Sequence, residues 1–211
     1  MMKKFDLSLY LVTDRNCLQG RDFYEAVEEA LRAGVTLLQL REKHLGLEDL
    51  VAEGKKVKAL CRKYQVPFLV DDNVEAAKIL EADGVHLGQE DEAIQKARAA
   101  LGPDAIIGIS AHNLEEALEA QAQGADYLGV GALYPTGSKK DASLLPAGML
   151  EKIVQAVRIP VAGIGGIQED RMEEVLDQGA AGCAMISAIL GAPDITAAVS
   201  RMKALIQARQ Q

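Results

Sequence analysis

The feature that most constrains this fold is a regular alternation of two patterns along the chain. Strand-like apolar runs recur at intervals of roughly 20–30 residues, as expected for successive βα units. The runs cover residues 7–13, 35–40, 67–70, 84–87, 106–110, 127–131, 161–164 and 182–187. Between them, apolar residues repeat with the period of an amphipathic helix, as in the segment from Phe23 to Leu31.

Eight βα units are the number that closes a (β/α)₈ barrel. We therefore predict an α/β fold in which residues 1–211 form a single TIM-barrel domain. The length of 211 residues and the hydrophobic fraction of 49% suit one large core. An open doubly wound sheet is the alternative, but the glycine fingerprint of a dinucleotide fold is missing after the first strand, where the sequence is Leu11-Val12-Thr13-Asp14-Arg15.

The overall charge and the cysteines limit the function classes. A net charge of −8 and a pI near 5.0 argue against nucleic-acid binding, although a local basic cluster can still hold an anionic ligand. No stretch approaches the ~20 apolar residues of a membrane span. Cys17, Cys61 and Cys183 are far apart and odd in number, which indicates reduced thiols. We expect a cytoplasmic protein without signal peptide or membrane partner, and the sequence leaves its oligomeric state open.

Polar residues at the strand ends are the candidates for function, because barrel active sites lie there. The second strand ends in Gln39-Leu40-Arg41-Glu42-Lys43. Side chains alternate along a strand, so Gln39, Arg41 and Lys43 should share one face. Two cations and an amide donor suit a multiply charged phosphate ester. The alternative is a solvated strand end with an ordinary Arg–Glu pair.

Carboxylates follow the next two strands. The third ends in Asp71-Asp72-Asn73, and the fourth leads to Asp91. Two carboxylates at one barrel mouth suit Mg²⁺, which also takes waters and phosphate oxygens as ligands. The alternative is that these residues cap the helices that follow. Together with the nearby Arg and Lys residues and with Lys139, they predict a magnesium–polyphosphate site.

A second phosphate site is expected on the other side of the mouth. Gly165-Gly166 and Ile186-Ser187 end strands seven and eight, where many barrels bind phosphate through backbone N–H groups. Tight turns without a ligand are the alternative. One metal-assisted and one metal-free phosphate site indicate two phosphorylated substrates that are joined in one pocket.

The histidines give weaker signals. His86, within a strand, is expected to be a satisfied core residue, and His44 to be solvated. His112 either faces the pocket or caps the helix that Asn113 and Glu116 open. No Ser–His–Asp or Cys–His arrangement stands out, which argues against acyl transfer.

Five motifs in order resemble the thiamine-phosphate synthase family, from about Leu9 to Ile189. They are Gln39-Leu40-Arg41-Glu42-Lys43, Val70-Asp71-Asp72, His86-Leu87-Gly88-Gln89-Glu90-Asp91, Tyr134-Pro135-Thr136-Gly137-Ser138-Lys139 and Gly163-Ile164-Gly165-Gly166-Ile167. The resemblance implies a transferase that joins 4-amino-2-methyl-5-hydroxymethylpyrimidine diphosphate to 4-methyl-5-(2-phosphoethyl)thiazole. The products would be thiamine phosphate and pyrophosphate, with Mg²⁺ as cofactor and no general base.

The resemblance also assigns residues. The pyrimidine diphosphate would be held by Gln39, Arg41, Lys43, Ser110 and Lys139, together with the adjoining Leu40, Glu42 and Asp71. Mg²⁺ would be bound by Asp72 and Asp91. The thiazole phosphate would be held by Thr136, Gly137, Ser138, Gly166, Ile186 and Ser187. Arg41, Lys139 and Ser110 would act in catalysis.

One position departs from the family, which often has Asn where this chain has Asp71. Asn can donate an N–H to a diphosphate, whereas an ionised Asp cannot. Asp71 would therefore approach the metal, stay protonated or weaken diphosphate binding.

Three rival functions are weighed against the synthase. A thiazole tautomerase of the same barrel type would isomerise its substrate, and His112 would serve it best; Asp91 and Lys139 favour the synthase. A sugar-phosphate aldolase would need a Schiff-base lysine within a strand, which neither Lys43 nor Lys139 provides. A non-catalytic precursor sensor would not need both metal carboxylates.

Overall fold

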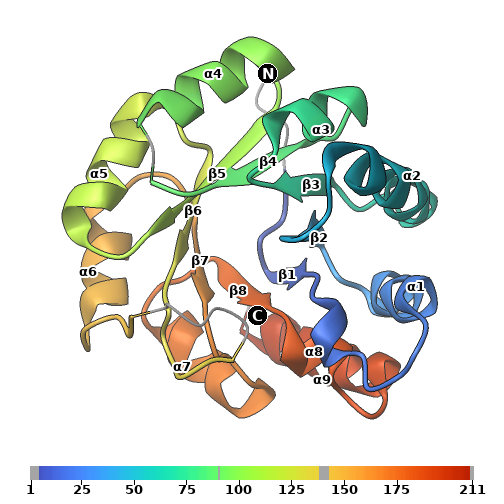
Figure 1. Ribbon diagram of the computed structural model, residues 1–211. Coiled ribbons are helices and arrows are strands. Elements are labelled where there is room, and N and C mark those ends of the chain that lie inside the picture. Colours follow the sequence, from blue (N-terminus) through green and yellow to red (C-terminus); the bar gives the residue numbers. More distant parts are fainter. Residues whose placement is uncertain (1–4, 90, 138–142, 210–211) are drawn as a thin grey trace.

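The chain forms a closed barrel of eight parallel strands in a computed structural model, which describes residues 5–89, 91–137 and 143–209 (Figure 1). The strands are β1 (Leu9–Val12), β2 (Leu37–Leu40), β3 (Phe68–Asp71), β4 (Gly84–Leu87), β5 (Ile106–Ala111), β6 (Tyr127–Val130), β7 (Val161–Ile164) and β8 (Gly182–Met185). Each strand pairs with the next, and β8 pairs back with β1. The (β/α)₈ prediction is confirmed.

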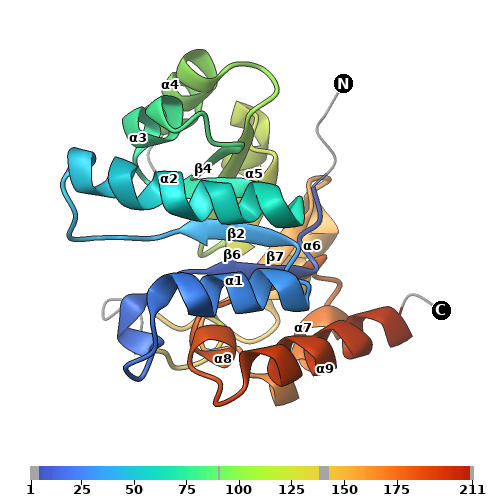
Figure 2. The same cartoon turned by 90° about the vertical axis from the view of Figure 1, so that its right-hand side faces the viewer.

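Helices surround the barrel on the outside (Figure 1). They are α1 (Phe23–Ala33), α2 (Leu47–Tyr64), α3 (Val74–Ile79), α4 (Asp91–Leu101), α5 (Leu114–Gln123), α6 (Met149–Ala156), α7 (Met172–Asp177), α8 (Ser187–Leu190) and α9 (Ile195–Ala208), with short 3₁₀ turns η1 (Arg15–Cys17) and η2 (Glu169–Arg171). Figure 2 shows α1 lying between α2 and α9. In the described ranges, no helix combines the length and apolar character needed to cross a bilayer.

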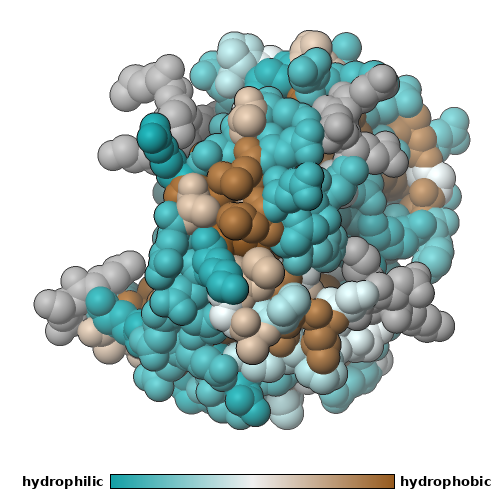
Figure 3. Space-filling view, turned by 90° about the vertical axis from the view of Figure 1, so that its left-hand side faces the viewer, coloured by the Kyte–Doolittle hydropathy of each residue, from teal (hydrophilic) through white to brown (hydrophobic). Residues whose placement is uncertain are grey.

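Side-chain caps open α1, α3, α5 and α9. The Asp22 carboxylate accepts from the N–H groups of Tyr24 and Glu25 at the start of α1. At α5, Asn113 Oδ1 accepts from the Glu116 N–H at 2.9 Å, and Glu116 Oε1 accepts from Asn113 Nδ2 at 2.7 Å. The bonds to Asp22 and to Asn113 Oδ1 satisfy backbone N–H groups that a helix start leaves open, and the side-chain bond between Asn113 and Glu116 holds the cap in place. Figure 3 shows that the face it presents is mostly hydrophilic, with apolar residues gathered in a few separate places.

Two cores sit on either side of the barrel wall. The larger lies between strands and helices, and the smaller fills the barrel interior with residues such as Tyr10, Leu37, Leu69 and Tyr127. Glycine makes room for the interior aromatic ring: a Cβ at Gly108 would come within 2.0 Å of the Tyr127 side chain. The interior is therefore a packed floor, and the open space lies above it at the carboxyl ends of the strands.

Candidate active site

A cavity of about 320 Å³ opens at the carboxyl ends of the strands. Many of the residues predicted from sequence meet there. Those that line it are Gln39, Arg41, Lys43, Asp71, Asp72, Ser110, Thr136, Gly166, Ile186 and Ser187. Residues from β2 through β8 thus converge on one site, as expected for a barrel enzyme.

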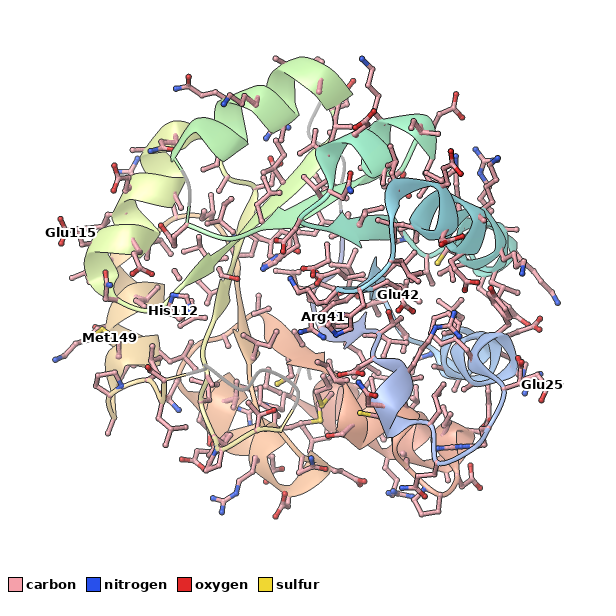
Figure 4. All side chains as sticks on the ribbon, viewed as in Figure 1. Glu25, Arg41, Glu42, His112, Glu115 and Met149 are labelled. Atoms are coloured by element: carbon pink, nitrogen blue, oxygen red, sulfur yellow. The ribbon has the colours of Figure 1, made fainter. Side chains whose placement is uncertain are left out.

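The end of β2 shows the expected alternation. Gln39 is buried, and it lines the cavity together with Arg41 and Lys43. Leu40 is fully buried in the core outside the barrel, and Glu42 Oε1 accepts from Arg15 Nε at 2.8 Å. Figure 4 shows Arg41 near the barrel axis, whereas Glu25 and Glu115 project outward. The structure does not bring Leu40 or Glu42 to the cavity lining, so their predicted contact with substrate is not supported by this geometry.

The two cations are neutralised by carboxylates. Lys43 Nζ lies 2.8 Å from Asp71 Oδ2 and also donates to Asp72. Arg41 lies farther away, with Nε 3.9 Å from Asp71 Oδ2. Its Nη1 is 3.7 Å from Oδ2 of Asp14, which sequence reasoning did not select. The site therefore holds a cluster of opposite charges in which three carboxylates surround two cations.

In a simple ion pair the pKa of the lysine rises and that of the carboxyl falls, but here the pKa values of Lys43 and Asp71 are both raised. The pKa of Lys43 is raised despite partial burial, because it bonds to two carboxylates. The pKa of Asp71 is also raised. Burial is the main cause, and the negative charge of Asp72 adds to it; together they outweigh the lowering of this pKa by Lys43 and Arg41. Asp71 is the more buried partner, so its environment penalises the ionised form.

Asp72 is not a helix cap. Asn73 takes that position, and its Oδ1 accepts from the Ala76 N–H at 2.8 Å. Asp72 instead has φ of 54°, in the left-handed region that non-glycine residues seldom adopt, and its carboxylate is half exposed at the mouth. Such a conformation at a cavity rim suits a residue that is held for binding rather than for helix stability.

Three predicted residues fall outside the described side chains. Asp91 begins α4, directly after the β4 loop, but its side chain is not described. Ser138 and Lys139 lie outside the described residues altogether. Among the side chains that are described, no group of three or more His, Cys, Asp or Glu is arranged to hold a metal.

The opposite side of the cavity is formed by glycine turns and the start of α8. Gly165 and Gly166 have φ of 94° and 66°, and a Cβ on Gly166 would come within 2.5 Å of the Pro135 carbonyl oxygen. Only glycine fits this close approach of two backbones. Ile186 caps α8 and Ser187 begins it. Gly137 is exposed and does not line the cavity.

A buried hydrogen-bond chain lies beneath the cavity, and sequence reasoning missed it. Gln39 donates to the Tyr10 hydroxyl, which lies 2.7 Å from the Tyr127 hydroxyl. Tyr127 is 2.9 Å from His86 Nδ1, and His86 Nε2 is 3.0 Å from Ser110 Oγ. His86 is thus a satisfied core residue, as expected, but it also lines the cavity. Tyrosines at inward positions of two predicted strands were the available signal.

His112 meets the first of its two alternatives, because it lines the cavity, whereas Asn113 rather than His112 caps α5. Its backbone N–H and Nδ1 both face Glu116 Oε2, at 2.7 and 3.0 Å, at the start of α5. The residue also lines the cavity, and it is solvent-accessible there. His44 is exposed, as expected.

Comparison with known proteins gives one consistent result. The profile of the family described as thiamine monophosphate synthase matches residues 9–189. Thiamine-phosphate synthase from Clostridium acetobutylicum is 48% identical over 92% of this chain and 92% of its own length, and that from Clostridium tetani is 43% identical over 95% and 96%. The solved structure of thiamine phosphate pyrophosphorylase from Pyrococcus furiosus superposes with a TM-score of 0.87, at 43% identity over 96% of each chain. The chain therefore belongs to the thiamine monophosphate synthase family, and it is a transferase that condenses the pyrimidine and thiazole parts of thiamine phosphate.

Proposed function

We propose that the cavity carries out this condensation by a dissociative displacement that Mg²⁺ assists. The observation that carries the proposal is the pairing of Arg41 and Lys43 with carboxylates on one side of the cavity, opposite the Gly165-Gly166 turn. The first side suits a diphosphate and the second a monophosphate. Two anionic substrates can then be held with their reacting ends over the barrel interior.

The basic side would hold the pyrimidine diphosphate. Arg41 and Lys43 provide charge-assisted donors for its oxygens, and Lys139 would add a further cation from the loop after β6. Gln39 and Ser110, whose side chains lie at the cavity floor, would contact the pyrimidine ring. Glu42 would act through Arg15 by holding the strand end in place.

The glycine side would hold the thiazole phosphate. Gly166, Ile186 and Ser187 line this wall, and Thr136 faces it from the loop after β6. Backbone N–H groups at such turns bind phosphate without needing a metal. Gly137 does not line the cavity in the ligand-free protein, so the contacts of Gly137 and Ser138 with the phosphate stay predictions from the family resemblance.

The residues present fit a hard divalent cation. Asp72 has an accessible carboxylate at the mouth, and Asp91 follows the neighbouring strand. A site with three protein ligands is not required, because Mg²⁺ is usually bound through one or two carboxylates plus substrate phosphates. When bound, Mg²⁺ would neutralise charge on the departing pyrophosphate.

The displacement needs no general base. The bond between the pyrimidine methylene carbon and the diphosphate oxygen breaks, and the pyrophosphate leaves with the electron pair. Arg41 and Lys43 stabilise that charge. The thiazole nitrogen then donates its lone pair to the cation-like carbon, so no proton has to move in the bond-forming step.

The tautomerase alternative is not favoured. The curated relatives reported above are named as synthases. His112, the residue that would serve the tautomerase, is bound to Glu116 and half exposed.

We also propose a cytoplasmic location and small-molecule substrates as the partners. Within the described residues, Cys17, Cys61 and Cys183 are free thiols, as a reducing compartment would keep them. Two of them are buried, and burial raises the pKa of the Cys183 thiol to about 12.

A magnesium titration of pyrophosphate release tests the metal assignment. Asp72→Ala and Asp91→Ala should each raise the Mg²⁺ concentration for half-maximal rate by about tenfold or more. Asp104→Ala, an exposed carboxylate in the loop before β5, is the matched control and should leave it unchanged. An unaltered Mg²⁺ response in both Asp72→Ala and Asp91→Ala would contradict the assignment.

A further inference from the structure

The buried chain Gln39–Tyr10–Tyr127–His86–Ser110 joins two sides of the cavity through the interior of the barrel. Its members come from β2, β1, β6, β4 and β5, and its two ends line the cavity. Tyr10 and Tyr127 are fully buried, and burial raises the pKa of both hydroxyls, which therefore stay protonated at neutral pH. Each hydroxyl then carries one proton to donate.

The barrel is shaped around these rings. A Cβ at Gly108 would come within 2.0 Å of the Tyr127 ring, and one at Gly129 within 3.0 Å of His86 Cε1. The rings of Tyr10 and Tyr127 pack edge to face, with centroids 5.9 Å apart. The rings are therefore held in one arrangement. The direction of donation along the hydrogen-bond chain could reverse only if protons moved between atoms, because the rings cannot turn.

The direction of donation follows from the amide at one end. The Gln39 amide nitrogen can only donate, so the Tyr10 oxygen accepts and the Tyr10 proton is left for Tyr127. The Tyr127 proton is then directed at His86 Nδ1, 2.9 Å away, if His86 is the tautomer with an unprotonated Nδ1. In that tautomer His86 carries its proton on Nε2, which lies 3.0 Å from Ser110 Oγ and donates to it.

Both ends of the chain acquire a defined polarity as a result. Ser110 accepts from His86, which leaves its own O–H as a donor for the cavity. Gln39 uses an N–H toward Tyr10, which leaves its carbonyl oxygen as an acceptor. A reversed chain would require the Gln39 amide to rotate and every proton in the chain to shift, so the two ends are coupled.

We propose that Tyr10 and Tyr127 are positioning residues that fix Gln39 as acceptor and Ser110 as donor, and thereby select an aminopyrimidine over an oxopyrimidine. This inference rests on the proposed placement of the pyrimidine at Gln39 and Ser110. An aminopyrimidine offers an exocyclic N–H donor and a ring nitrogen acceptor. The 4-oxo analogue offers a carbonyl acceptor and a ring N–H donor, which oppose the polarity of the site.

Equilibrium binding tests the selection without catalysis. The dissociation constants of the aminopyrimidine diphosphate and its 4-oxo analogue are measured by calorimetry with Mg²⁺ and without thiazole phosphate. The wild type should bind the amino compound at least about tenfold more tightly. Tyr10→Phe interrupts the hydrogen-bond chain at a residue that does not line the cavity. It should reduce the ratio of the two dissociation constants by about tenfold. Tyr127→Phe should do the same and is the second variant.

The matched control is Tyr64→Phe, which removes a hydroxyl that donates to Glu28 on the outside of the barrel. It should leave the ratio unchanged. A general loss of stability would weaken both ligands equally, so the ratio separates positioning from folding. An unaltered ratio in both Tyr10→Phe and Tyr127→Phe would overturn the proposal.

Nitrogen NMR of the ligand-free protein tests the polarity by itself. The chain has three histidines, and His86 should show the neutral form with the proton on Nε2. A proton on Nδ1, or on both nitrogens at neutral pH, would overturn the polarity argument. If the wild type instead fails to bind the aminopyrimidine diphosphate at all, the proposed function fails and the selection role fails with it.

Discussion

Lys43 Nζ lies 2.8 Å from Asp71 Oδ2, so a cation that we assign to the diphosphate is already paired in the ligand-free protein. Asp71 also lies near Arg41. A diphosphate must therefore displace this carboxylate, or bind beside it, before it reaches both cations. The balance between Asp71 and the two basic side chains sets how strongly the site attracts its substrate.

Replacement of Asp71 by Asn should strengthen substrate binding. The amide keeps the shape of the carboxyl, adds an N–H donor and no longer competes for Lys43. We expect the KM for the pyrimidine diphosphate to fall about three- to tenfold. Steady-state kinetics at saturating thiazole phosphate measure this, and an increase in KM would show that Asp71 assists binding.

The same variant should show a pH-dependent gain in stability. The pKa of Asp71 is raised in the folded protein, so its contribution to stability is present at low pH and is lost as the pH rises through the folded pKa. At neutral pH the buried, ionised carboxylate therefore lowers the free energy of unfolding, and the uncharged Asn side chain does not. We expect Asp71→Asn to raise the Tm more at pH 7 than at about pH 4. Asp104→Asn is the control, and a gain of equal size at both pH values would contradict the argument.

Loss of the charged side chains at the end of β2 should lower kcat/KM by very different factors. Arg41→Ala and Lys43→Ala remove groups that line the cavity, and each should lower kcat/KM by about a hundredfold or more. Glu42→Ala removes a group that faces Arg15, so the loss should stay within about tenfold. Equal losses at all three positions would mean that Glu42 reaches the substrate.

Gly108→Ala should destabilise the barrel. The new methyl group would meet the Tyr127 ring, which is enclosed on all sides and cannot move away. We expect a loss of about 1–3 kcal/mol or more in the free energy of unfolding, measured with urea. Gly88→Ala, at a glycine with nothing within 4 Å of the added Cβ, should change it by less than about 0.5 kcal/mol. Equal effects of the two changes would contradict the packing described here.

Much of the fold could be predicted because it depends on local periodicity. The eight strand-like runs correspond to β1–β8, although the runs at 7–13, 35–40, 127–131 and 182–187 are longer than β1, β2, β6 and β8. Thr13 lies beyond β1 although its N–H still donates to the Gln39 carbonyl at 3.0 Å, and Ile186 lies beyond β8 because it caps α8. Apolar character alone cannot distinguish a paired residue from one in such a loop.

From the residues alone, the site could be predicted only where the alternation of side chains along a single strand determines which residues face the cavity. Gln39, Arg41 and Lys43 follow from alternation along one strand, and they do line the cavity. Asp14 near Arg41, and Tyr10 beside Tyr127, depend on which strands become neighbours or face each other across the barrel. That information is three-dimensional, and no spacing along the chain contains it. The roles of the predicted site residues remain proposals.

The most direct test of the central claim is an assay of both products. The purified protein is incubated with the pyrimidine diphosphate, the thiazole phosphate and Mg²⁺, and pyrophosphate and thiamine phosphate are measured together. We expect equal amounts of both products, with neither formed when one substrate or Mg²⁺ is left out. Absence of both products, together with isomerisation of a thiazole carboxylate phosphate, would contradict it.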